Sequence, residues 1–138
     1  MTPKIEEFLR VKKPETPCLV MDLDVVAACF NQLQTVMPWS RIYYAVKANP
    51  ASPVLQTLSN LGSRFDAASP AEIDRCLAAG AAPKDISYGN TVKKQGDIAT
   101  AYCLGIRLFA FDSAEELEKL GVAAPGAQVF CLVQVPNT

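Results

Sequence analysis

Ile42-Tyr43-Tyr44-Ala45-Val46-Lys47-Ala48-Asn49-Pro50 is the stretch that decides how this chain folds. It is an apolar run that carries a single charge, that of Lys47. Its β-branched and aromatic residues predict a buried strand from Arg41 to Ala48, which Asn49-Pro50 ends. Lys47 therefore falls at the carboxyl end of the strand, where α/β folds keep their active sites. Burial of a lone ammonium is costly, so this amine should lose its proton, pair with a carboxylate or bond covalently to an aldehyde.

Alternation along this strand puts Lys47 on the same face as Tyr43 and Ala45. Ile42 and Val46 lie on the other face, which suits packing against helices. We therefore expect Lys47 to point into the mouth of a barrel. The alternative is a lysine whose ammonium simply reaches solvent at the end of a strand.

Four more extended apolar segments follow at a step of about 22 residues, each bounded by a helical pattern, and this alternation is typical of βα units. They cover residues 64–68, 86–90, 108–112 and 128–135. Ser52, Ser69 and Ser113 have the sequence context of helix caps, and Gly62, Gly80 and Gly105 that of helix ends. About five βα units predict an α/β fold, either an open parallel sheet or part of a (β/α)8 barrel. The 138 residues are too few for a closed barrel, which takes about 250.

The residues before the first long helix predict one more strand. Thr16 to Leu23 is an extended apolar run, and Asp24 has the position of a cap for a helix from Val25 to about Met37. The place of this strand in a sheet is left open.

Charge and composition exclude several classes of function. The formal net charge is −1, with 13 basic and 14 acidic residues, which gives no electrostatic footprint for nucleic acid or an anionic membrane. The absence of histidine excludes Ser-His-Asp and Cys-His nucleophile systems and histidine-based zinc sites within this chain. Five scattered cysteines suggest neither a disulfide framework nor a metal site. We expect a cytoplasmic protein that acts on a small molecule.

Acidic residues after the second predicted strand are the next candidates. Asp66 ends that strand and could approach Lys47, although an aspartate that accepts hydrogen bonds from loop amides is equally compatible with the sequence. Glu72 is explained by a capping box with Ser69 without any function. Tyr88, Asn90 and Lys93 lie at the end of the third strand, where Lys93-Lys94 reads as a solvated pair.

Three segments together resemble the ornithine decarboxylase-like group of pyridoxal-phosphate-dependent decarboxylases (group IV, with the alanine-racemase-like fold). They are residues 44–50, 65–73 and 86–94, in matching order and spacing. The resemblance covers about Pro14 to Cys131 of the chain. It implies pyridoxal 5'-phosphate as cofactor and a pyridoxal-phosphate-binding (β/α)8 barrel followed by a β domain.

By this resemblance, the cofactor-linking catalytic lysine falls on Lys47, and two cofactor-binding acids fall on Asp66 and Glu72. Residues 1–24 would form a leader and a strand of the β domain, and residues 25–138 a truncated barrel. A homodimer is implied, because the partner subunit completes the site in this family. The implied reaction is decarboxylation of a basic amino acid, with L-ornithine to putrescine in polyamine biosynthesis as the expected case.

The chain departs from the family pattern near its end. Leu132 stands where the family has an arginine close to the cofactor, and we expect the resemblance to stop after Cys131. We therefore expect an N-terminal fragment that alone neither binds pyridoxal phosphate tightly nor decarboxylates. The open alternatives are a diaminopimelate or arginine decarboxylase, a related racemase, a non-catalytic cofactor-binding protein, or a decayed relative that pairs with an intact subunit.

Overall fold

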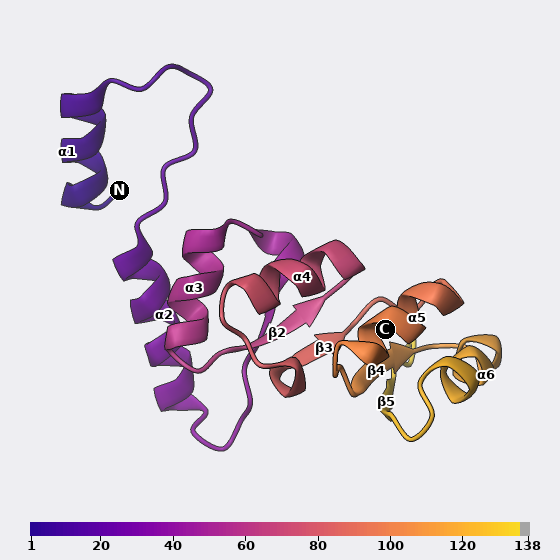
Figure 1. Ribbon diagram of the computed structural model, residues 1–138. Helices are drawn as coiled ribbons and strands as arrows, with labels where there is room; N and C mark the ends of the chain where they lie inside the picture. The colour runs from indigo at the N-terminus through magenta and orange to yellow at the C-terminus, as the bar shows by residue number, and fades with distance from the viewer. Residues whose placement is uncertain (136–138) are drawn as a thin grey trace.

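Parallel strands and intervening helices make up the computed structural model, which describes residues 1–135 (Figure 1). In that part of the chain the sheet has five strands, paired in sequence order and all parallel. They are β1 (Tyr43–Ala45), β2 (Arg64–Ala67), β3 (Ile86–Tyr88), β4 (Leu108–Phe111) and β5 (Gln128–Cys131). The predicted α/β class with about five parallel strands is confirmed.

Six α-helices and two short 3-10 helices connect and precede these strands. The α-helices of the described residues are α1 (Pro3–Lys12), α2 (Leu23–Val36), α3 (Ser52–Asn60), α4 (Pro70–Ala78), α5 (Gln95–Cys103) and α6 (Ala114–Ala123). The 3-10 helices are η1 (Val46–Ala48) and η2 (Pro83–Asp85). No helix within residues 1–135 combines the length and apolar character needed to cross a membrane.

Most of the predicted helix boundaries hold because their signals are local. Ser69 Oγ accepts from the Glu72 N–H at 3.3 Å, and Ser113 Oγ accepts from the Glu116 N–H at 3.2 Å, so both serines cap as predicted. The prediction for Ser52 is wrong, because this residue already lies in α3 and no side chain caps that helix.

The predicted strand at residues 16–23 is wrong. Residues 13–22 form no strand, since none of the described strands lies beside them, and a strand needs a pairing partner. Leu23 already belongs to α2, whose cap is Asp22 and not Asp24. Thr2 donates to Asp22 at 2.7 Å and so ties α1 to the start of α2. The division into domains at residue 24 remains a prediction, and residues 136–138 lie outside the described part.

One face of the sheet packs against helices and forms the core. Phe65, Ala67 and Phe109 are fully buried on this face, and the apolar residues of α3 to α6 cover them. Tyr44 contacts Phe65 edge to face on the same side. Alternation along each strand therefore leaves the intervening residues on the opposite, concave face.

Candidate active site

The concave face of the sheet bears an open cavity of about 420 Å3, within the usual range for small-molecule sites. All five strands contribute to it. Its lining residues are Tyr43, Ala45, Asp66, Ser87, Leu108 and Phe130. The sequence prediction that Tyr43 and Ala45 face away from the helices is confirmed.

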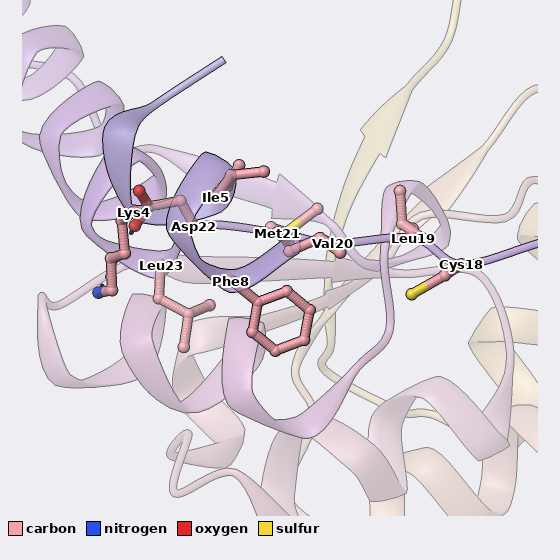
Figure 2. Close-up of a pocket in the computed structure, with 9 residues that line it drawn as sticks. All are labelled: Lys4, Ile5, Phe8, Cys18, Leu19, Val20, Met21, Asp22 and Leu23. Atoms are coloured by element: carbon pink, nitrogen blue, oxygen red, sulfur yellow. Dashed lines mark ion pairs between the residues drawn. The ribbon is translucent and has the colours of Figure 1, made fainter. Parts of the chain in front are cut away.

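A second cavity, of about 400 Å3, lies between α1 and residues 18–23. Figure 2 shows Phe8 and Leu23 beside it, with Met21 farther along the extended segment. Its charged lining residues are Lys4 and Asp22, whose Nζ and Oδ1 atoms lie 3.7 Å apart. None of the predicted site residues lines this second cavity, whereas Asp66 lines the first, so we place the candidate site on the concave face.

Lys47 lies in η1 and not in β1, so the predicted strand to Ala48 is wrong. The chain turns after Ala45, which buries Val46 completely and leaves Lys47 exposed. Lys47 is not among the residues that line the cavity. Within residues 1–135 it forms no ion pair. Its amine is thus reachable from solvent at the carboxyl end of the sheet.

Asp66 is brought next to this turn by strand pairing. Ala45 pairs with Asp66 across β1 and β2, so Lys47 follows two residues after the partner of Asp66. The predicted adjacency of the two strands is confirmed, but the Asp66 carboxylate is held by another residue. Ser87 donates its hydroxyl to Asp66 Oδ1 at 2.6 Å from β3. This bond fixes a half-buried carboxylate on the cavity wall.

Gly89 lies directly beneath the Asp66 carboxylate. Its N–H donates to the carbonyl of Ala67 at 2.8 Å, so β2 and the loop after β3 are in close register. A Cβ added at Gly89 would overlap the carboxylate oxygens of Asp66. The glycine is therefore required by this close approach and not by an unusual backbone angle.

Replacing Gly89 with alanine should force Asp66 away from Ser87 and destabilise the fold by about 1–3 kcal/mol, as overpacking does. Urea unfolding measures this change. Gly121→Ala in α6 is the matched control, because nothing lies within 4 Å of a Cβ there, and it should be neutral or stabilising. In a double-mutant cycle, Asp66→Ala should remove most of the cost of Gly89→Ala. Equal costs with and without the aspartate would contradict this explanation.

Glu72 acts on the turn between β2 and α4. Its Oε2 accepts from the Ala68 N–H at 2.7 Å, and its own N–H is capped by Ser69. The capping-box alternative therefore describes its contacts, with Ala68 in place of Ser69 as the donor. A role for Glu72 in binding a cofactor remains a prediction.

Lys93 is the residue that the sequence interpretation got most wrong. We predicted a solvated Lys93-Lys94 pair, but Lys93 is only 4% exposed and Lys94 alone lies in solvent. Lys93 Nζ lies 2.8 Å from Glu116 Oε1 in α6, and the side chains of both residues are almost fully buried. Lys119, one turn along α6, pairs with the other oxygen of Glu116. Buried lysines are ordinarily paired in this way.

The charges of this cluster shift the pKa values of its members. Burial lowers the pKa of Lys93, and Glu116 offsets this only in part. Burial would raise the pKa of Glu116, but hydrogen bonds from Lys119 and Lys93 outweigh it and hold the pKa below its ordinary 4.5. Glu116 is therefore ionised in the folded protein at neutral pH.

Acid should weaken the fold through Glu116. Because its folded pKa lies below the unfolded value of 4.5, the contribution is complete above about pH 4.5 and is lost as pH falls through the folded pKa. Urea midpoints measured between pH 7 and pH 3 should fall less steeply in a Lys93→Met/Glu116→Leu variant. Identical slopes for this variant and the unmodified chain would contradict the assignment.

Comparison with known proteins gives a family match over most of the chain. The matching family model is described as pyridoxal-dependent decarboxylase, pyridoxal binding domain, and it covers residues 23–137. The match continues past Cys131, so the expectation that the resemblance stops there is wrong.

The similar proteins include decarboxylases from several organisms. A lysine/ornithine decarboxylase of Selenomonas ruminantium is 35% identical over 126 residues, which are 91% of this chain and 32% of that protein. A chloroplastic ornithine decarboxylase of Nicotiana glauca is 34% identical over 125 residues, 91% of this chain and 29% of that protein. This chain thus spans about a third of the length of the curated relatives it matches.

Solved structures show the same fold. The structure of SrLDC in complex with PLP and cadaverine has a TM-score of 0.88 and 34% identity, and covers 100% of this chain and 36% of that one. The arginine decarboxylase of Paramecium bursaria Chlorella virus has a TM-score of 0.86 and 26% identity, with 95% of this chain and 36% of that one covered. These likenesses confirm the predicted partial (β/α)8 barrel.

Proposed function

This chain belongs to the pyridoxal-dependent decarboxylases, as part of their pyridoxal-binding domain, and from that premise we propose that it supplies part of the active site of a basic amino-acid decarboxylase. The observation that carries the proposal is a reachable amine, Lys47, at the carboxyl end of β1, one strand away from the fixed carboxylate of Asp66. An aldehyde cofactor bonds to an amine, and fixed polar groups of the protein orient it.

The Lys47 amine and the cavity that Asp66 lines fit pyridoxal 5'-phosphate. When bound, this cofactor supplies an aldehyde that links to amines and a ring that accepts the electrons released as carbon dioxide leaves. Lys47 is exposed and free of ion pairs within residues 1–135, so its amine is available to an aldehyde. The cavity of about 420 Å3, which Ala45 and Asp66 line, can hold a small aromatic ring.

Each predicted site residue then has a distinct task. Lys47 holds the cofactor and moves a proton at its amine nitrogen. Asp66 orients bound groups with its carboxylate, which the Ser87 hydroxyl holds by a hydrogen bond of 2.6 Å to Oδ1. Glu72 keeps the turn after β2 in shape through its bond to Ala68, and so supports the position of Asp66.

The proposed substrate is a basic amino acid, with L-ornithine to putrescine as the first candidate, in polyamine biosynthesis. Support comes from the names of relatives, which include lysine/ornithine, ornithine and arginine decarboxylases. Assays of the complete gene product with ornithine, lysine, arginine and diaminopimelate, each followed by release of carbon dioxide, decide among them. Racemisation without carbon dioxide, or no reaction with any substrate, would favour the racemase or the non-catalytic alternative.

We further propose that the 138-residue chain alone is inactive, that the active form is a homodimer, and that it is cytoplasmic. The concave face is covered by no helix of residues 1–135, and a decarboxylase site must exclude water. The chain should therefore show no absorbance band of a protein-linked cofactor after addition of pyridoxal phosphate. A band that is lost in Lys47→Ala would show that the chain suffices. Sedimentation of the complete gene product tests the dimer.

A further inference from the structure

Lys93 is held by two backbone carbonyls and one carboxylate. Its Nζ donates to the carbonyls of Asn90 at 2.8 Å and Ala110 at 2.6 Å, and lies 2.8 Å from Glu116 Oε1. The two carbonyls accept hydrogen bonds from the ammonium, and the Glu116 carboxylate supplies the opposite charge. The ring of Tyr88 covers the same charge at 5.6 Å.

β3 ends before β4 does, and this difference explains why a side-chain hydrogen-bond donor is needed here. β3 ends at Tyr88, which pairs with Phe109, whereas β4 continues to Phe111. Ala110 therefore lies beyond the last paired residue of β3, and its carbonyl would be buried without a partner from that strand. The ammonium of Lys93 takes the place of the missing strand donor.

α6 binds the backbone of residue 93 as well as its side chain. The Lys93 N–H donates to Glu116 Oε2 at 3.4 Å, and Lys119 Nζ donates to the Lys93 carbonyl at 2.6 Å. We call the three residues Lys93, Glu116 and Lys119 the ionic clamp. It fixes the end of the loop of residues 89–93 to the first turns of α6.

The start of that loop is Gly89, which supports the Asp66 carboxylate. The loop is thus held at one end by the ionic clamp and touches the site at the other. Buried ion pairs contribute little net stability compared with apolar residues of similar size, but they can specify one geometry. A clamp of this kind therefore suits positioning better than bulk stabilisation.

We propose that Lys93 is a positioning residue: with Glu116 and Lys119 it fixes the loop of residues 89–93 so that Gly89 sets the orientation of Asp66. The catalytic consequence rests on the proposed function, but the geometric statement does not. None of the hydrogen-bond and ion-pair partners of Lys93 lines the cavity.

Hydrogen exchange in the complete gene product, without added cofactor, tests the geometry. The variant is Lys93→Met/Glu116→Leu, which replaces the buried pair by apolar side chains and so separates positioning from stability. Exchange in peptides covering residues 86–94 should become about tenfold faster or more, while the thermal midpoint stays near that of the unmodified protein. Asp85→Asn, which removes the Arg64 ion pair of 3.4 Å at the other end of β2, is the control and should leave this exchange slow.

Cofactor affinity tests the link to Asp66. Lys93→Met and Asp66→Asn should each weaken pyridoxal phosphate binding about tenfold, and the double variant should be no weaker than Asp66→Asn alone, since both act through one group. Unchanged exchange in residues 86–94 would overturn the proposal, and so would losses that multiply in the double variant. If the unmodified protein binds no pyridoxal phosphate, the proposed function fails, and the exchange result alone decides on the clamp.

Discussion

Lys47→Ala in the complete gene product should lower decarboxylation by more than about a thousandfold, because no other group replaces a nucleophilic amine. Lys47 is exposed at the carboxyl end of β1, so its removal leaves no cavity in the core. The fold should therefore remain intact, with an unchanged urea midpoint. The absorbance band of protein-linked pyridoxal phosphate should disappear together with the activity.

Two further variants control for charge and for position. Lys47→Arg keeps a positive charge but removes the primary amine, and it should be as inactive as the alanine variant. Lys84→Ala removes another exposed lysine, in η2 ahead of β3, and should leave activity unchanged. If Lys47→Ala retained a tenth of the activity or more, Lys47 would not be the cofactor lysine.

Lys93→Met should destabilise the fold by about 3 kcal/mol, at the lower end of the cost of breaking a buried ion pair. The variant leaves the carbonyls of Asn90 and Ala110 without their donor, and each unsatisfied buried group is costly. Glu116 keeps its bond to Lys119, which limits the loss. The free energy of unfolding in urea measures the effect.

The apolar double variant is the control for this prediction. Lys93→Met/Glu116→Leu removes both charges, and it should recover most of the lost stability. Lys94→Met changes the neighbouring exposed lysine and should alter stability by less than about 0.5 kcal/mol. A Lys93→Met variant as stable as Lys94→Met would show that the buried pair contributes nothing.

The main features of the site could be predicted where strand order alone fixes them. Lys47 and Asp66 lie near the carboxyl ends of two consecutive predicted strands. Consecutive parallel strands usually lie side by side, as β1 and β2 do. The exact contacts of Asp66 could not be predicted, since Ser87 and Gly89 come from a third strand and its loop. A serine in the middle of the third apolar run and a glycine after it were the available signals.

The N-terminal strand shows the opposite case. Residues 18–23 have the composition of a strand, yet they form none in the described residues, because no strand lies beside them. Strand formation depends on a partner whose position is not written in the segment itself. A similar limit applies to Lys47, because β1 ends at Ala45 and the chain turns into η1, where Val46 is buried and Lys47 is exposed.

The sequence by itself determined the alternation of strands and helices, because caps, glycines and apolar periodicity act over a few residues. The family and the candidate lysine came from the resemblance of residues 44–50, 65–73 and 86–94. Only the tertiary structure decided that Lys93 is buried while Lys94 is solvated. That outcome depends on Glu116, 23 residues farther along, and on where β3 ends beside β4. Burial of a charge is set by such distant partners, so no local pattern around Lys93 could reveal it.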